Sequence, residues 1–337
     1  MSKYILYPGC SMERSARPYL DSTMAIRKDL DVEFEEVQDW NCCGATEYWS
    51  VSNIPAYALV GRNLALASQQ VNGTNTLVAG CSACYLNLSK TDNYMGKDKS
   101  LNASVNEALA AGGLSYEPGT LQVRHLLDIV LNDVGLDAVA SKVVKPLSGL
   151  RVAPYYGCMI VRPDLQERYD DPEYPQGMDE LLKVLGAEVV DYPLKTHCCG
   201  GHMTQISEST AYEIIRRLLY AADQYKADLI VTLCPMCQMN LDAFQGDVNR
   251  HFNTNFHLPV LYFTQLIGLA FGHNAKELGI GREFVDSTDA LAKIGVEVPE
   301  PPKKQSRRRR DDPSLPMPKP LAKSKPQNEE PQNEEVT

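Results

Sequence analysis

The chain reads Leu77-Val-Ala-Gly-Cys81-Ser-Ala-Cys84-Tyr-Leu-Asn-Leu88, and 153 positions after Cys81 it reads Ile230-Val-Thr-Leu-Cys234-Pro-Met-Cys237-Gln-Met-Asn-Leu241. Each stretch runs from a short apolar segment into Cys-x-x-Cys. A short apolar run of this kind is typical of a buried strand, so we predict a central strand of a sheet at both places. The likeness of the two stretches indicates that the chain contains a repeat.

Two further pairs of segments match in the same order along the chain. Tyr4-Ile-Leu-Tyr-Pro-Gly-Cys10 corresponds to Val152-Ala-Pro-Tyr-Tyr-Gly-Cys158, at an offset of 148 residues between the cysteines. Asn41-Cys42-Cys43-Gly44-Ala45 corresponds to His197-Cys198-Cys199-Gly200-Gly201, at an offset of 156 residues. The nearly constant offset indicates a duplicated domain with small differences in loop length.

All ten cysteines of the chain belong to this repeat, five in each half, and none is left over. Incidental buried cysteines would not be distributed in this way, so we interpret all ten as ligand candidates. They are Cys10, Cys42, Cys43, Cys81 and Cys84 in the first half, and Cys158, Cys198, Cys199, Cys234 and Cys237 in the second.

Each half shows the same order of predicted elements. A strand runs into the first cysteine, a helix and a second strand lead to Cys-Cys-Gly, and a long helix precedes the strand before Cys-x-x-Cys. The predicted ranges are 3–7, 18–30, 32–37, 56–71 and 76–79 in the first half, and 151–155, 178–185, 188–192, 208–225 and 229–233 in the second. Strands that alternate with helices and are apolar on both faces indicate a parallel sheet covered on both sides. We therefore predict an α/β fold with two tandem, pseudo-symmetric domains, residues 1–147 and 148–298, each with a small parallel sheet flanked by helices.

The three cysteine groups of each half follow the carboxyl ends of predicted strands. In parallel sheets, ligands bind beyond these ends, so five sulfurs from distant positions can converge on one edge. Adjacent cysteines can reach one site only from an irregular turn, and Gly44 and Gly200 permit such a turn because glycine tolerates positive φ.

Composition and charge exclude several classes of protein. The 337 residues are 44% hydrophobic and 23% charged, with a formal net charge of −10. This charge disfavours binding to nucleic acid. We recognise neither a signal peptide nor a membrane-spanning stretch, so we expect a cytoplasmic protein without direct membrane insertion. Cytoplasmic thiols stay reduced, which favours metal or redox ligands over structural disulfides.

The segment 299–337 differs in composition from the rest of the chain. It is rich in proline and charge, contains Arg307-Arg-Arg-Arg310, and repeats Pro-Gln-Asn-Glu-Glu. Few of its residues could enter a core, so we predict a disordered tail.

Five thiols at one site are more protein ligands than the simplest metal centres bind. A structural zinc ion and an ordinary cubane cluster each take four protein ligands. Either one cysteine of each half is free for redox chemistry, or the cofactor has more iron positions facing the protein than a cubane has. A structural zinc in one or both halves remains the alternative.

The pattern Cys-x31-Cys-Cys-Gly…Cys-x-x-Cys, repeated as Cys-x39-Cys-Cys-Gly…Cys-x-x-Cys, resembles the duplicated cysteine-rich (CCG) domain of the B subunit of heterodisulfide reductase and of its relatives in sulfur-oxidising complexes. The resemblance covers residues 1 to 298, and both sets of five cysteines are complete. It implies two noncubane [4Fe-4S] clusters, one held by each set. It also implies a two-electron conversion between a disulfide and two thiols, with the substrate bound between the two clusters.

The resemblance further implies partners: a flavin and iron–sulfur protein similar to the family's A subunit, and a ferredoxin-like protein similar to its C subunit. The substrate would be a small disulfide or thiol. The chain has neither a ferredoxin cysteine run nor a complete Gly-x-Gly-x-x-Gly fingerprint, so we expect electrons to come from another chain.

Two alternatives stay open at this point. CCG modules also occur beside succinate, glycolate and lactate dehydrogenases, where such a chain would be an electron relay or an anchor. A zinc scaffold without redox function is the other alternative. His197 and His202 flank the second Cys-Cys-Gly, and we expect them to tune the site through hydrogen bonds or to be solvated, rather than to be ligands.

Overall fold

The computed structural model describes residues 1–45, 48–71, 73–162 and 170–300. Met1–Pro301 form one compact unit. The tail predicted from residue 299 onward lies outside the described residues except for its first two positions.

The compact unit contains two four-stranded sheets with the same topology. The first has the strand order β2-β1-β3-β4 and the second has the order β6-β5-β7-β8. All pairings are parallel, for example Ile5 with Leu77 and Pro154 with Val231. The strands are β1 (Ser2–Tyr7), β2 (Val32–Glu36), β3 (Thr76–Ala79), β4 (Gln122–His125), β5 (Arg151–Tyr155), β6 (Glu188–Val189), β7 (Leu229–Thr232) and β8 (Val260–Tyr262). The predicted α/β fold with two parallel sheets is confirmed.

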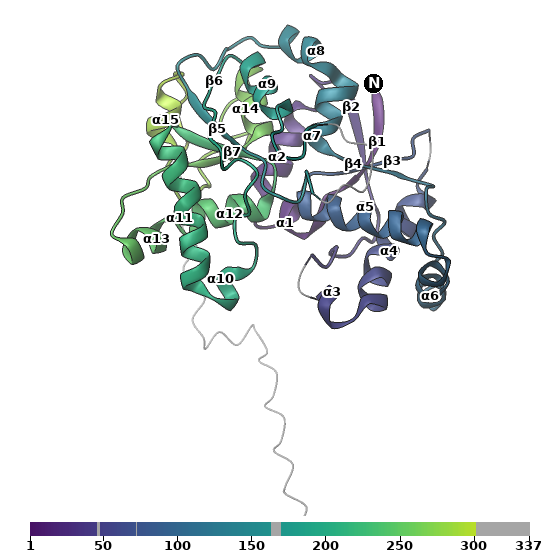
Figure 1. Cartoon of the computed structure of the whole chain (residues 1–337). Coiled ribbons are helices and arrows are strands. Elements are labelled where there is room, and N and C mark those ends of the chain that lie inside the picture. Colours follow the sequence, from purple (N-terminus) through teal and green to yellow (C-terminus); the bar gives the residue numbers. More distant parts are fainter. Residues whose placement is uncertain (46–47, 72, 163–169, 301–337) are drawn as a thin grey trace, which may run out of the picture. The chain divides into compact units, whose positions relative to one another are not determined.

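Helices flank both sheets (Figure 1). Those of the first half are α1 (Gly9–Glu13), α2 (Arg17–Ile26), α3 (Tyr48–Val51), α4 (Asn53–Gln69), α5 (Ser82–Lys97), α6 (Lys99–Ala110), α7 (Leu126–Asp128), the π-helical segment η1 (Ile129–Gly135) and α8 (Leu136–Ser141). Those of the second half are α9 (Gly177–Val184), α10 (Met203–Ile206), α11 (Glu208–Gln224), α12 (Pro235–Ala243), α13 (Gln245–Phe252), α14 (Phe263–Ala270) and α15 (Thr288–Ala292).

The central strands are buried on both faces, as their composition predicts. Leu77, Val78 and Ala79 of β3 have no exposed surface, and β7 is buried along its whole length. Continuous apolar strands of this kind are typical of parallel sheets covered by helices. The two sheets thus fix the strand ends after which Cys81 and Cys234 follow.

Two predicted elements are shorter than their sequences indicate. The helix predicted for 18–30 ends at Ile26, and Asp31 adopts a left-handed φ of 56° that turns the chain into β2. The strand predicted for 188–192 has two residues, because only Arg151 and Val152 of β5 pair with it.

The two halves share a buried interface formed mainly by α2 and α14. The hydroxyls of Ser22 and Thr264 lie 2.7 Å apart. The ring of Tyr19 stacks on that of Tyr262, with centroids 4.3 Å apart. The Tyr19 hydroxyl donates to the carbonyl of Gly80 at 2.9 Å and to that of Leu233 at 3.4 Å. One side chain therefore ties together the two segments that precede Cys81 and Cys234.

No helix among the described residues is long and apolar enough to cross a bilayer.

Candidate metal centre

The cysteines stand where the strands end, as the strand pattern predicts. Cys10 lies in α1, directly after β1, and Cys81 caps α5, directly after β3. Cys42 and Cys43 lie in the irregular segment between β2 and α3. The second half repeats this arrangement, with Cys234 at the start of α12.

In the first half the five thiols contact one another in succession. The Sγ atoms of Cys10 and Cys42 are 3.5 Å apart, and those of Cys43 and Cys84 are 3.3 Å apart. Cys43 lowers the pKa of Cys42 and Cys81 raises that of Cys84, so these neighbouring thiols complete the series. The structure thus brings together all five cysteines that were predicted as ligands in this half.

The second half forms the same series of thiol contacts, and the two series meet. Cys158 contacts Cys198, which contacts Cys199, and the series continues through Cys237 to Cys234. Cys234 also lies close enough to Cys81 of the first half for each thiol to shift the pKa of the other. The ten sulfurs therefore form one continuous row, with Cys81 and Cys234 at its midpoint; we call this contact the junction.

The ends of the row are accessible and its middle is buried. Cys10, Cys42 and Cys198 are exposed and Cys158 is half-buried, whereas the other six thiols are buried. All ten are free thiols. Within the described residues, no three side chains of His, Cys, Asp or Glu converge in a way that would hold a single metal ion. The thiols are thus arranged as successive pairs.

Hydrogen bonds between the thiols make equivalent cysteines ionise first in the two halves. The bond from Cys10 lowers the pKa of Cys42, and the bond from Cys158 lowers the pKa of Cys198. At the junction the bond to Cys234 raises the pKa of Cys81, while bonds from Cys237 and then Cys81 lower the pKa of Cys234. A thiolate is the form that binds metal. These pKa shifts therefore determine which thiols lose their protons first.

Glycines make room for this packing of sulfur. Gly44 has a φ of 63° and Gly200 a φ of 95°, which confirms the predicted turns after the paired cysteines. A Cβ atom on Gly9 would lie 2.9 Å from Sγ of Cys84, and one on Gly157 would lie 3.0 Å from Sγ of Cys237. No side chain fits at either position without moving a sulfur.

Two tyrosines hold the Cys-Cys-Gly turns in matching ways. The Tyr7 hydroxyl donates to the carbonyl of Asn41 at 2.6 Å, and the Tyr155 hydroxyl donates to that of His197 at 2.5 Å. Both tyrosines are buried in the core, and they also anchor the backbone before the paired cysteines.

Asn87 of α5 and Asn240 of α12 hold the same turns from the other side. Nδ2 of Asn87 donates to the carbonyl of Cys43 at 3.0 Å. Nδ2 of Asn240 donates to the carbonyls of Cys199 at 3.1 Å and Gly201 at 2.8 Å. This function was not predicted from the sequence, although both asparagines occupy the same place in the repeated Cys-x-x-Cys-x-x-Asn-Leu.

His125 and Tyr262, the last residues of β4 and β8, were not predicted either. Both are buried at the ends of strands that pair with the strands leading to Cys81 and Cys234: His125 pairs with Ala79 of β3, and Tyr262 pairs with Thr232 of β7. The signal was available in the matched segments Leu121-Gln-Val-Arg-His125 and Leu258-Pro-Val-Leu-Tyr262, which extend the repeat to a fourth strand.

The two histidines that the sequence singles out lie beside the second Cys-Cys-Gly turn. His197 is exposed and His202 is half-buried immediately before α10. Their predicted tuning function stays a prediction.

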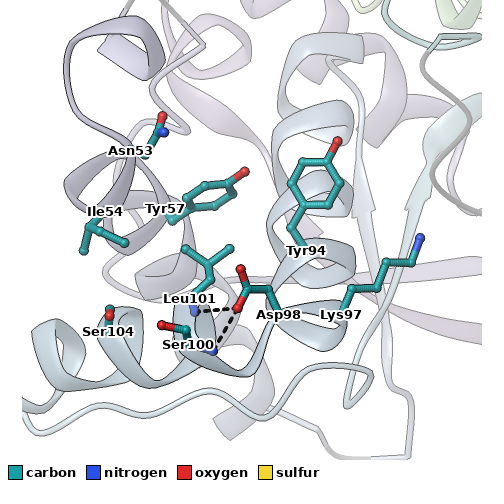
Figure 2. A pocket seen from close by; sticks show the side chains of 9 residues that line it. All are labelled: Asn53, Ile54, Tyr57, Tyr94, Lys97, Asp98, Ser100, Leu101 and Ser104. Carbon is teal, nitrogen blue, oxygen red and sulfur yellow. Dashed lines mark hydrogen bonds between the residues drawn. The ribbon is translucent and has the colours of Figure 1, made fainter.

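A separate cavity of about 500 Å³ lies among α4, α5 and α6, where Tyr57, Tyr94 and Lys97 line it (Figure 2). Asp98, drawn in the same view, accepts hydrogen bonds from the backbone N–H groups of Ser100 and Leu101, so it caps α6. None of the ten cysteines lines this cavity.

Comparisons with known proteins agree with this geometry. The family described as CCG, the cysteine-rich domain, matches residues 4–89 and 152–242. The match therefore occurs twice, once over each set of cysteines. The chain is a duplicated CCG-domain protein.

Several full-length relatives are similar to the chain. The 8-methylmenaquinol:fumarate reductase membrane anchor subunit of Wolinella succinogenes is 34% identical over 286 residues, covering 85% of this chain and 98% of the relative. The B subunit of the ferredoxin/F(420)H(2)-dependent CoB-CoM heterodisulfide reductase of Methanosarcina acetivorans is 31% identical over 297 residues, covering 87% and 97%. A protein of Archaeoglobus profundus that is described as like the B subunit of heterodisulfide reductase is 30% identical, covering 82% and 93%. The chain belongs to the family of heterodisulfide reductase B subunits, which confirms the resemblance seen in the sequence.

A solved structure shares the fold. The crystal structure of a hypothetical protein from Helicobacter pylori aligns with a TM-score of 0.66 at 15% identity, covering 85% of this chain and 52% of that one.

Proposed function

We propose that this chain is the iron–sulfur subunit of a heterodisulfide reductase-like complex and converts a disulfide to two thiols, or the reverse, between two noncubane [4Fe-4S] clusters. The observation that carries the proposal is the junction: two complete sets of five thiols meet at Cys81 and Cys234. The domains would be residues 1–147 and 148–298.

The residues present fit two multi-iron groups. Each half offers five free thiols, one more than a zinc ion or a cubane takes. Gly9 and Gly157 leave the nearest sulfurs unobstructed by a side chain. Cys10, Cys42, Cys43, Cys81 and Cys84 would hold the first group, and Cys158, Cys198, Cys199, Cys234 and Cys237 the second. Zinc in one half stays the alternative cofactor.

The reaction that we propose needs an electron pair and two protons: a disulfide gains two electrons and two protons, and its S–S bond breaks to give two thiols. When bound, the two clusters would each supply one of the electrons. The protein's own contribution is to hold two equivalent sets of thiols in contact and to keep the junction away from water. It also leaves Cys10, Cys42 and Cys198 accessible at the ends of the row.

The electrons would come from partner chains, a flavin-containing protein and a ferredoxin-like protein. The names of the relatives support a multi-subunit setting, because each names a subunit or a subunit-like protein. Ten free thiols suit the reducing cytoplasm, where we place the protein.

A second candidate function is favoured by a specific observation. The fumarate reductase anchor subunit is 34% identical to this chain over nearly its whole length. In that setting the row of ten sulfurs would relay electrons between partner subunits, and no disulfide would bind.

One experiment separates the two functions. The full chain is purified without oxygen, reduced, freed of reductant and mixed with a small asymmetric disulfide, and released thiol is measured together with the EPR spectrum. Disulfide reduction predicts about one disulfide cleaved per two electrons stored, and a thiol-dependent signal. An unchanged spectrum and no released thiol would contradict the lead function and leave the relay.

A further inference from the structure

A lysine and an aspartate form a buried ion pair in the second half of the molecule. Nζ of Lys195 lies 3.0 Å from Oδ1 of Asp179, and the two side chains are only 1% and 4% exposed. Asp179 lies in the first turn of α9, and Lys195 lies three residues before Cys198. Charged side chains are almost never buried so completely unless they are paired, so the position of each depends on the other.

Tyr156 connects this ion pair to the segment that carries Cys158. Its hydroxyl donates a hydrogen bond to Oδ2 of Asp179. The same hydroxyl accepts hydrogen bonds from the backbone N–H groups of Met178 at 2.8 Å and of Asp179 at 3.1 Å. These N–H groups belong to the first turn of a helix, where no carbonyl of the helix can bind them. Tyr156, which has no exposed surface, therefore fixes α9 and the ion pair relative to the end of β5.

The backbone of Lys195 completes the connection between the two cysteine segments. Its carbonyl accepts hydrogen bonds from the N–H groups of Tyr156 at 2.9 Å and of Gly157 at 3.1 Å. Gly157 directly precedes Cys158. The segment before Cys158 and the segment before Cys198 are thus joined through their backbones, and side chains of both segments also meet at Asp179.

The first half has different residues at the matching positions. Pro8 stands where the second half has Tyr156, and proline has neither an N–H group nor a hydroxyl. Asp39 stands where the second half has Lys195; its side chain is 80% exposed and pairs with Arg62 of α4. The first half can therefore serve as an internal control for the ion pair.

Stability alone does not account for a buried ion pair. Removing two charges from water costs free energy that their attraction often fails to repay, and apolar residues of similar volume often give an equally stable fold. The pair does, however, impose geometry, because the ammonium group and the carboxylate must face each other. It thereby gives the two cysteine segments a single relative position.

We propose that Lys195, Asp179 and Tyr156 are positioning residues of the second metal site: they hold the backbone before Cys158 against the backbone before Cys198, so that both thiols are in place before metal binds. This inference rests on the proposed function only in that the second set of cysteines holds a metal group. Ligands that are already ordered bind more tightly, because binding then costs less conformational entropy.

The test replaces the ion pair by neutral residues in two backgrounds. In the double variant Lys195→Met/Asp179→Asn, methionine fills much of the volume of lysine, asparagine can still accept the hydrogen bond from Tyr156, and no buried charge remains. The double variant is made in the Cys43→Ser chain, which keeps only the second complete set of cysteines. It is also made in the Cys199→Ser chain, which keeps only the first. All are full-length chains purified without oxygen.

Two readouts are compared: the chelator concentration that removes half of the iron, and the urea midpoint of the metal-free chain. In the Cys43→Ser background the double variant should lower this chelator concentration about 10- to 100-fold, as is usual when groups that orient metal ligands are removed. The first site and both urea midpoints should stay nearly unchanged. Unchanged retention of iron by the second site would overturn the inference. Equal losses from both sites would also overturn it, because the pair would then act through the stability of the whole fold.

Should the double variant misfold, amide hydrogen exchange of the wild-type chain supplies a second test. The N–H groups of Tyr156 and Gly157 should exchange slowly even in the metal-free chain, because their acceptor is in place without metal. Exchange as fast as in an exposed loop would contradict the inference.

Both tests are made without substrate. A chain that holds iron but cleaves no disulfide therefore refutes the lead function and leaves this inference standing, whereas a second set of cysteines that binds no metal refutes both.

Discussion

Glycine 157 shows how closely single residues fit the row of sulfurs. Its φ of 69° lies in the left-handed region, and a Cβ atom there would lie 3.0 Å from Sγ of Cys237. Gly113 has the same φ of 69°, but a Cβ atom there would meet nothing within 4 Å. A substitution at either glycine would strain the backbone, but only a substitution at Gly157 would also crowd a cysteine sulfur.

We predict that Gly157→Ala releases iron from the second site, whereas Gly113→Ala does not. Both variants should lose roughly 1 kcal/mol through strain in the left-handed region. Only Gly157→Ala must also displace the sulfur of Cys237. Iron per chain and urea unfolding measure the two effects. Equal iron content in the two variants would show that the site tolerates the displacement.

The buried carboxyl of Glu283 makes the stability of the fold depend on pH. Burial raises its pKa from 4.5 to about 7, and Oε1 has no partner among the described residues. Burial likewise raises the pKa of the nearby Asp242 to about 6. A carboxyl whose pKa is higher in the folded state stabilises the fold when protonated, so this stability is lost as the pH rises through about 5 to 7.

The Glu283→Gln variant should therefore lose less stability than the wild type as the pH rises. Glutamine can keep the hydrogen bond from the Gly281 N–H, which Oε2 now accepts at 2.8 Å, and it carries no charge. At pH 8 the variant should be more stable than the wild type by about 2 kcal/mol, and at pH 5 the difference should be small. Urea unfolding at both pH values measures this, with the exposed Glu297→Gln as control. A variant that is less stable at pH 8 would contradict the assignment.

At the scale of elements, the strands and long helices of the repeat were predictable, because buried parallel strands and amphipathic helices have distinct periodicities. β3 was predicted at its observed bounds, 76–79, and β5 at 151–155. β4 and β8 were not predicted, because Gln-Val-Arg-His and Val-Leu-Tyr are short and have no cysteine to draw attention to them. His125 and Tyr262 were missed for the same reason.

The convergence of five cysteines was predictable from strand ends, whereas the contact between the two sets was not. The former follows from the topology of a parallel sheet. The contact of Cys81 with Cys234 depends on how α2 packs on α14, and that packing is determined by shape rather than by pattern. The ligand assignments and the tuning by His197 and His202 stay predictions.

Asparagine 240 links helix α12 to the turn that carries the paired cysteines. Its amide donates to two carbonyls of that turn, at 3.1 and 2.8 Å. Asn240→Ala should leave both carbonyls without their donor, cost about 2 kcal/mol and release iron from the second site. Urea unfolding and iron analysis measure this, with Asn132→Ala as control because Asn132 donates on an exposed surface of η1. Retention of all iron would show that the turn keeps its conformation without the hydrogen bonds from Asn240.

At the scale of the whole molecule, the two halves act as one body because they share buried contacts. Tyr19 from the first half and Tyr262 from the second stack within the interface, and Tyr19 bonds to the backbone on both sides of it. The row of ten sulfurs runs across this interface without a break. A rigid interface is what two centres need if they are to share an electron pair.

The most direct test of this account is the iron, acid-labile sulfide and zinc content of the full chain purified without oxygen. Two [4Fe-4S] clusters predict about eight irons and about eight sulfides per chain, with little zinc. Replacing Cys43 or Cys199 by serine should remove about half of the iron in each case. Zinc in place of iron, with no sulfide, would contradict the central claim and leave a structural scaffold.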